Sequence, residues 1–125
     1  MIWGLKKTDF AITLNFSVRV YPIEIMNLLI NHTTAIQALC KEFDVKSLHA
    51  FGSVNSDRFS PESDVDFIVD LGDKTDFEYA EAYFQLAERL EQILKRSVDL
   101  VTVRSLKNPY FIQKVEESKS LLYAA

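Results

Sequence analysis

Asp64 and Asp66 open a short apolar segment, and their spacing points to metal chemistry. In a β-strand, residues i and i+2 point to the same face, so the two carboxylates would lie side by side. Like charges at that distance repel, and one carboxyl group would normally take up a proton. A divalent cation removes the conflict, and carboxylate oxygens suit Mg²⁺ or Mn²⁺. The pair predicts a metal site for phosphoryl or nucleotidyl displacement, in which two ions lie about 3.5–4 Å apart.

A third carboxylate and a phosphate-binding turn accompany the pair. Asp99 lies between Val98 and Leu100 in another apolar segment, although aspartate is depleted in strands. Gly52 and Ser53 end an earlier segment, where glycine lets a phosphate approach the backbone and serine offers a hydroxyl and amide N–H groups. Arg58, in the loop between, is a candidate cation for a triphosphate, although a solvated loop residue is the simpler interpretation.

The elements that must position these residues follow from apolar periodicity. Four segments have a strand pattern: 10–20, 45–51, 63–71 and 97–103. Three segments carry an apolar stripe at helical spacing: 23–43, 75–96 and about 109–117. Thr75 and Glu78 have the spacing of a capping box, and Asn108 followed by Pro109 is a typical helix start. The Tyr79 and Tyr83 stripe is expected to be core or a partner surface.

Composition narrows the class of protein. The chain has 125 residues, of which 48% are hydrophobic, and this suits one compact domain. Cys40 is the single cysteine, which excludes an internal disulfide and fits a reducing compartment. We expect a cytoplasmic protein without a membrane segment, because no apolar run reaches about 18 residues and no signal peptide is evident. A net charge of −4 without a basic stripe argues against a direct nucleic-acid substrate.

Four stretches together carry a family resemblance: "FGS" at 51–53, "SDVDFIVD" at 63–70, "VDLV" at 98–101 and "LKNPYF" at 106–111. Their order and spacing resemble the DNA polymerase β-type nucleotidyltransferase superfamily, and most closely its minimal nucleotidyltransferases (MNT). The resemblance covers about residues 26–125, the expected nucleotidyltransferase domain. Residues 1–25 would form an N-terminal extension, and Met26 is an alternative start. The implied fold is α/β (α+β), with a small mixed β-sheet flanked by helices.

The resemblance also implies a site and a reaction. Gly52 and Ser53 would meet the nucleoside triphosphate, and Asp64, Asp66 and Asp99 would ligate two Mg²⁺ ions. Asp99 would further help to activate the attacking hydroxyl. The reaction implied is transfer of a nucleoside monophosphate to that hydroxyl with release of pyrophosphate. The loop departs from the family pattern, which has Ala and Gly where this chain has Asn55 and Asp57, so its phosphate-binding geometry is in question.

Small proteins of this family resemble the antitoxin of a HEPN–MNT toxin–antitoxin pair. This implies transfer of AMP from ATP to a tyrosine of a partner HEPN ribonuclease toxin. Two alternatives stay open: a non-catalytic binding antitoxin, and a small-molecule nucleotidyltransferase of the antibiotic-modifying type. The alternating segment 10–20 could pair with a partner or a second copy, so a homo-oligomer is also open. In the plainest interpretation, Asp64 and Asp66 cap a neighbouring helix, Asp99 faces solvent at a strand edge and Ser53 is a helix N-cap.

Overall fold

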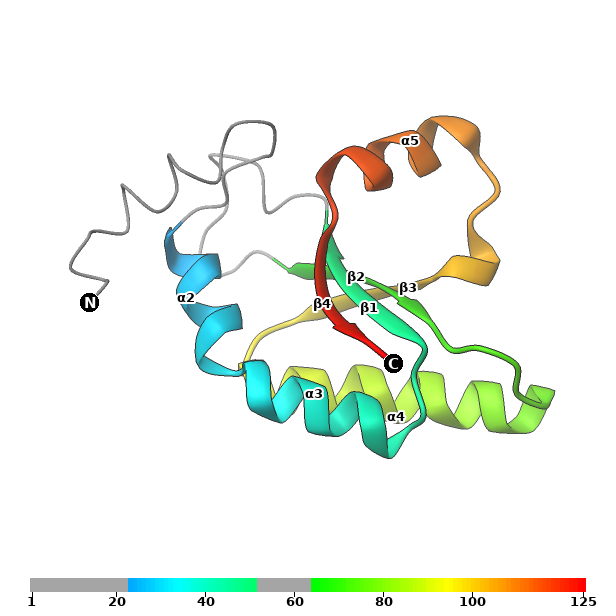
Figure 1. The fold of residues 1–125 in the computed structure, drawn as a ribbon, viewed down its shortest axis with the longest axis horizontal. Helices are drawn as coiled ribbons and strands as arrows, with labels where there is room; N and C mark the ends of the chain where they lie inside the picture. Colours follow the sequence, from blue (N-terminus) through cyan, green and yellow to red (C-terminus); the bar gives the residue numbers. More distant parts are fainter. Residues whose placement is uncertain (1–22, 52–63) are drawn as a thin grey trace.

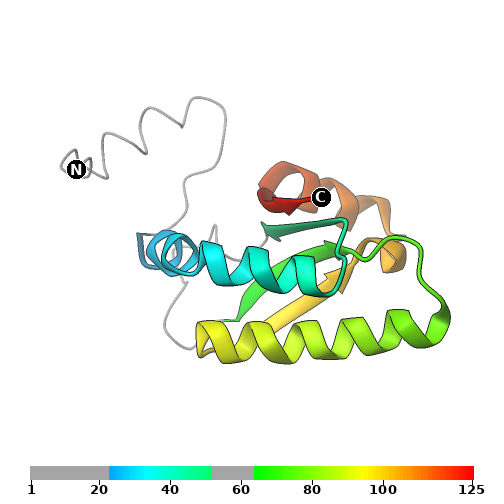
Figure 2. The same ribbon diagram turned by 60° about the horizontal axis from the view of Figure 1, so that its bottom comes forward.

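The computed structural model of the chain describes residues 23–51 and 64–125. In this part of the chain, helices cover both faces of a β-sheet (Figures 1 and 2). α3 (Thr33–Glu42) and α4 (Asp76–Leu94) pack on one face, and α5 (Pro109–Ser118) packs on the other. The predicted strand at 10–20 and the predicted site residues Gly52, Ser53 and Arg58 lie outside the described residues.

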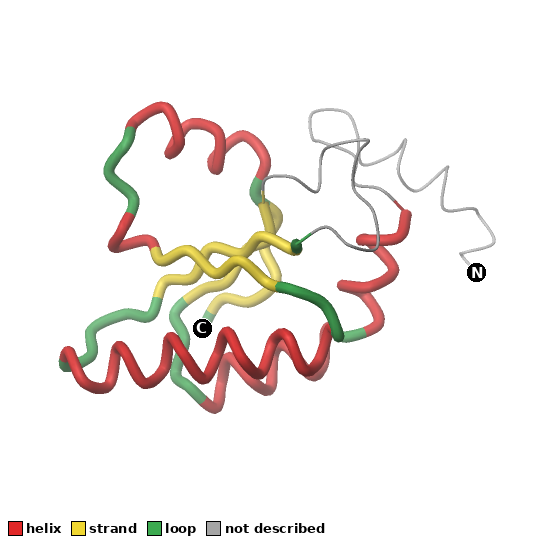
Figure 3. Tube along the Cα trace, turned by 180° about the vertical axis from the view of Figure 1, so that it is seen from behind, coloured by secondary structure: helices red, strands yellow, loops and turns green. Residues whose placement is uncertain are grey.

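The sheet has four strands within the described residues: β1 (Ser47–Phe51), β2 (Val65–Asp70), β3 (Val98–Thr102) and β4 (Ser120–Ala124). Their order is β3-β2-β1-β4 (Figure 1), and Figure 3 shows the strands in yellow between the helices. β2 and β3 run parallel, whereas β1 is antiparallel to both β2 and β4. The sheet is therefore mixed, as the family resemblance implies. β4 was not predicted as a strand, because its pairing with β1 is a tertiary contact that its own five residues do not encode.

α4 is built as its sequence predicts. Thr75 Oγ1 accepts a hydrogen bond from the Glu78 backbone N–H at 3.2 Å, and Glu78 Oε1 accepts one from the Thr75 N–H at 3.3 Å. This reciprocal capping box satisfies two N–H groups at the start of the helix. Leu86 and Leu90 are fully buried and pack with the apolar side chains of β2, namely Val65, Phe67 and Val69. The packing of α4 therefore covers one face of β2, the strand that begins one residue after Asp64.

The single helix predicted over 23–43 is wrong, because the structure divides it into α2 (Ile23–Asn31) and α3. The break falls at His32, whose Nδ1 lies 2.9 Å from the Leu28 carbonyl oxygen. Thr33 Oγ1 donates to the Leu29 carbonyl oxygen at 2.9 Å. Side chains of this type compete with backbone N–H groups for carbonyls one turn earlier. The spacing of apolar residues does not show that side chains at His32 and Thr33 will interrupt the helix.

A second, smaller core lies between the sheet and α5. Phe51, Ile68 and Val115 are buried there, and the ring of Phe111 meets that of Phe51 edge to face at 5.9 Å between centroids. α5 begins at Pro109, and the Asn108 side chain accepts hydrogen bonds from two N–H groups of its first turn. The helix and its predicted cap are confirmed. α5 thus covers the face of the sheet that carries Phe51 and Ile68.

Candidate functional site

Asp66 and Asp99 lie directly opposite each other on neighbouring parallel strands. Their Cα atoms are register partners in the β2–β3 pair, where strands lie about 4.8 Å apart. Two residues further on, Ile68 and Val101 belong to the core beneath α5, so the two aspartates share that face by the strand period. Asp64 precedes β2 by one residue and shares the parity of Asp66. The structure therefore brings the three predicted aspartates to the end of the sheet where β2 and β3 begin.

The electrostatics of Asp99 show that the three carboxylates interact. Partial burial raises the pKa of Asp99, and the negative charges of Asp66 and Asp64 raise it further. A fold that holds like charges together in this way is a candidate site for a cation, because a cation would relieve the repulsion. Asp99 is exposed on β3, at the edge of the described sheet, as the plainest interpretation expected, but it is not isolated, because Asp66 is its register partner.

The donor set suits magnesium, although the side chains are not gathered around one point. In residues 23–51 and 64–125, no three His, Cys, Asp or Glu side chains approach closely enough to hold an ion. Asp64, Asp66 and Asp99 are nevertheless close enough for the first two to act electrostatically on the third. They are hard oxygen donors of the kind that Mg²⁺ prefers. The chemistry of these oxygen donors thus fits the metal, whereas their positions do not gather them around one ion.

The end of β1 completes this edge of the sheet. Phe51, the last residue of β1, is the register partner of Asp66 in the antiparallel β1–β2 pair. Gly52 and Ser53, the predicted phosphate-binding residues, follow Phe51 in the sequence and lie outside the described residues. The sequence analysis gave Phe51 and Phe111 no role of their own, although both stand in stretches that carry the family resemblance. In the structure their rings pack together, and Phe51 lies opposite Asp66.

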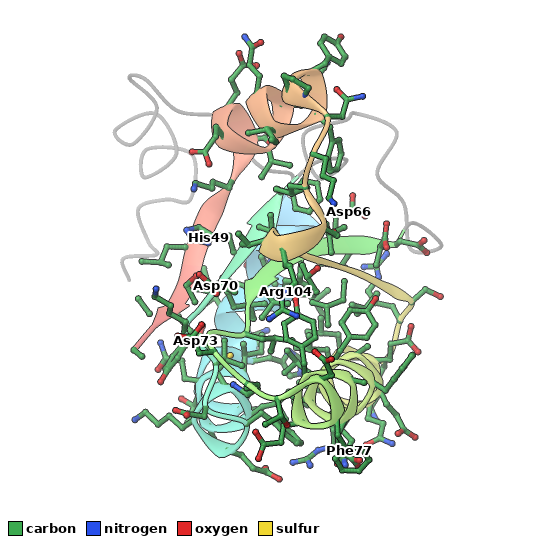
Figure 4. All side chains as sticks on the ribbon, turned by 90° about the vertical axis from the view of Figure 1, so that its right-hand side faces the viewer. His49, Asp66, Asp70, Asp73, Phe77 and Arg104 are labelled. Carbon is green, nitrogen blue, oxygen red and sulfur yellow. The ribbon has the colours of Figure 1, made fainter. Side chains whose placement is uncertain are left out.

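The remaining aspartates of this region serve the turn after β2. Asp70 Oδ1 accepts a hydrogen bond from the Gly72 N–H at 2.9 Å, and Gly72 has a φ of 70°, which glycine adopts without strain. Figure 4 shows Asp70 and Asp73 apart from Asp66. The prediction that they end the strand and form the turn is confirmed, and they are separate from the candidate site.

A second feature lies on the outer edge of β3. A groove of about 420 Å³ runs between α4 and this strand, lined by Tyr79, Ala80, Tyr83, Phe84, Leu100, Val101, Thr102 and Ser105. The Tyr83 hydroxyl donates to the Leu100 carbonyl oxygen at 2.7 Å. Tyr79 and Tyr83 were expected to be core or a partner surface. Both are partly buried against the core, and both also line this open groove.

Comparison with protein families and sequences agrees with this geometry. Residues 33–122 match the model of the nucleotidyltransferase domain family. Two proteins of Methanocaldococcus jannaschii, each named "Putative protein adenylyltransferase", are 35% and 31% identical to this chain over 94 residues. Each match covers 75% of this chain and 90% of the relative.

Solved structures share the fold. A toxin–antitoxin structure with AMP-PNP matches with a TM-score of 0.58 and 26% identity, covering 74% of this chain and 73% of that chain. A complex of tri-AMPylated HEPN toxin from Shewanella oneidensis with MNT antitoxin matches with a TM-score of 0.55 and 26% identity, covering 77% and 72%. The resemblance stated from the sequence is confirmed. This chain belongs to the nucleotidyltransferase domain family and is a nucleotidyltransferase enzyme.

Proposed function

We propose that this protein transfers AMP from ATP to a tyrosine hydroxyl of a HEPN-type ribonuclease toxin and so acts as its antitoxin. The observation that carries the proposal is the alignment of Asp66 with Asp99 across β2 and β3, with Asp64 on the same side. The relatives named as protein adenylyltransferases and the complex that contains an AMPylated HEPN toxin support the choice of AMP and of a protein acceptor.

In the proposed mechanism, Asp64, Asp66 and Asp99 would hold two Mg²⁺ ions. When bound, such ions neutralise phosphate charge and lower the pKa of an attacking hydroxyl. Gly52 and Ser53, directly after Phe51, bind the triphosphate, and Arg58 adds a positive charge to it. Asp99 orients the attacking hydroxyl and accepts its proton. The hydroxyl oxygen forms a bond to the α-phosphorus as the bond to pyrophosphate breaks.

The charge of the chain favours a protein acceptor. Its net charge is −4, and three aspartates meet at the site where the acceptor must enter. Binding of a nucleic acid favours a basic stripe on the protein surface, and the net charge of this chain is negative. A tyrosine side chain brings a neutral hydroxyl on an apolar ring. The net charge of the chain therefore suits a tyrosine acceptor better than a long nucleic acid.

Intact mass spectrometry tests the proposal. A HEPN protein of the same organism, encoded beside this gene where such a neighbour exists, is incubated with the wild-type protein, ATP and Mg²⁺, and its mass is compared with that after incubation with a D64A/D66A variant. We expect a gain of one or more AMP units with the wild type and none with the variant. Asp73→Ala serves as the matched control, because Asp73 is an exposed aspartate outside the site. An unmodified toxin in every reaction would refute the proposed activity.

A further inference from the structure

We propose that the outer side of α4 and the adjoining groove on β3 form the surface that binds the acceptor protein. This inference rests on the proposed function and names the docking surface of that reaction. The surface takes an apolar anchor of the partner that is surrounded by lysine and arginine side chains.

The outer side of α4 carries aromatic residues where a solvated helix would carry polar ones. Phe77 and Phe84 are 75% and 68% exposed. They are seven residues apart, which places them on the same side of the helix, two turns from each other. Phe77 lies on the side of α4 that is turned away from the sheet (Figure 4). Large exposed aromatic side chains that line up in this way are typical of protein interfaces.

Two carboxylates alternate with these rings. Glu81 follows Phe77 by four residues, and Glu88 follows Phe84 by four, so the four side chains form one line, here called the α4 stripe. All four residues are exposed. Arg89 is the only basic residue of α4, and it is paired with Glu42 at 2.9 Å. The stripe is thus both aromatic and acidic, and it is complementary to an apolar surface with basic side chains around it.

The groove extends the α4 stripe towards the sheet. Phe84 is a member of both, and its ring meets that of Tyr83 edge to face at 5.2 Å between centroids. The opposite wall of the groove is β3, through Leu100, Val101 and Thr102. An apolar side chain of the partner that entered the groove would therefore contact aromatic rings on one side and strand residues on the other.

The hydrogen bond of Tyr83 decides what kind of segment can bind here. Among the described residues β3 is an edge strand, and an edge normally accepts another strand through its backbone groups. The Leu100 carbonyl already accepts a hydrogen bond from the Tyr83 hydroxyl at 2.7 Å. An added strand would have to compete with Tyr83 for that carbonyl. The geometry favours anchoring by side chains, as when an amphipathic helix lies along α4 and inserts an apolar residue into the groove.

The position of the groove links it to the candidate site. Asp99 directly precedes Leu100 on β3, and strand residues are spaced by about 3.3 Å, so Val101 lies about 7 Å along the strand from Asp99. Of the strand residues that line the groove, Val101 shares the sheet face of Asp99, whereas Leu100 and Thr102 face α4. A protein anchored in the groove would therefore reach around the edge of β3 to present a tyrosine to the aspartates. A ribonuclease has to attract RNA phosphates, so basic side chains are expected on its surface. Such a surface matches Glu81 and Glu88.

The test compares an F77S/F84S variant with the wild type and with Leu121→Ser. Leu121 is 58% exposed and lies on β4, at the opposite edge of the sheet, so it controls for loss of an exposed apolar side chain. The readouts are the dissociation constant for the same HEPN protein, the KM for that protein, and the KM for ATP. Circular dichroism and thermal melting check that every variant is folded.

We expect F77S/F84S to raise the dissociation constant and the acceptor KM at least about tenfold, because exposed aromatic anchors carry much of the energy of an interface. The KM for ATP stays within about twofold, and Leu121→Ser matches the wild type in all three values, because neither change touches the aspartates. An E81K/E88K variant provides an independent test, in which binding weakens and its dependence on salt decreases.

The outcomes separate this inference from the proposed function. If the wild type modifies the HEPN protein and F77S/F84S binds it equally well, the docking surface is wrong and the function stands. If the wild type binds without modifying it and F77S/F84S binds more weakly, the docking surface stands and the activity falls. If the wild type neither binds nor modifies it, both are overturned.

Discussion

Asp66 on β2 and Asp99 on β3 are register partners in a parallel strand pair, so the fold holds two carboxylates opposite each other. Phe67 and Leu100, the next residues on the two strands, are buried on the other face and keep the strands in this register. A one-residue slip would move every side chain to the opposite face. Burial of Phe67 and Leu100 stabilises the sheet. The register that it sets also places the carboxylates of Asp66 and Asp99 on neighbouring strands, where they repel each other.

Asp99→Asn should stabilise the protein at neutral pH and abolish AMP transfer. The pKa of Asp99 is raised in the folded state, so the folded state binds the proton more tightly than the unfolded state. Stability from this group is then greatest at low pH and is lost as the pH rises through the folded pKa. Removing the charge should add about 0.5–1 kcal/mol at pH 7, a value reduced for solvent screening.

Thermal melts at pH 7 and at about pH 4 check this expectation, since carboxyl groups begin to protonate near the lower value. The gain from Asp99→Asn should shrink at the lower pH. Asp73→Asn is the control and should change the melting temperature at neither pH, because Asp73 is exposed and outside the site. A gain of equal size at both pH values would show that charge repulsion is not its cause.

Mg²⁺ or Mn²⁺ should stabilise the wild-type protein and not a D64A/D66A variant. A ligand that binds the folded state alone adds about 2.7 kcal/mol at a concentration one hundred times its dissociation constant. Differential scanning fluorimetry over a Mg²⁺ titration measures the effect, with Ca²⁺ as a second ion and an excess of chelator as the blank. Equal stabilisation of both proteins would place the ion elsewhere.

The sequence predicts elements whose ends are encoded locally better than it predicts the edges of the fold. α4 was predicted within two residues at each end because its start is encoded locally by Thr75 and Glu78. The period of two in strands placed Asp64 and Asp66 on one face. The register of Asp66 with Asp99 could not follow from either segment alone, because it depends on how the two strands pack against α4.

The parts that escaped prediction depend on tertiary contacts. β4 is a strand because β1 offers it an edge, and α2 ends at His32 because side chains there bond to preceding carbonyls. From the sequence alone, Phe84 cannot be distinguished from the apolar residues of α4 that are buried. Its exposure emerges only when Leu86 and Leu90 fix the direction in which α4 faces the core. The α4 stripe is therefore a finding of the structure.

Cys40 should be inert in the native protein. The side chain is fully buried in α3, and burial raises the pKa of its thiol to about 12, so almost no thiolate exists at pH 8. Iodoacetamide at pH 8 should therefore label the folded protein very slowly and label the protein in guanidinium chloride completely. Mass spectrometry over time follows both reactions. Rapid labelling of the folded protein would mean that α3 opens readily from the sheet.

Tyr83→Phe should destabilise the protein by about 0.5–1.5 kcal/mol, the usual contribution of one intramolecular hydrogen bond. The substitution retains the ring and removes only the hydroxyl that donates to the Leu100 carbonyl. Tyr110→Phe is the matched control, because that tyrosine is exposed on α5. Urea unfolding measures both variants.

Tyr83→Phe has a second consequence, because it frees a backbone acceptor on the edge strand β3. Free edges promote pairing between chains. Light scattering during storage at high concentration should therefore rise for Tyr83→Phe and not for Tyr110→Phe. If light scattering rises for neither variant and only stability changes, the hydrogen bond holds α4 to the sheet without protecting the edge. The two measurements thus separate the role of Tyr83 in packing from its role in closing β3 to other strands.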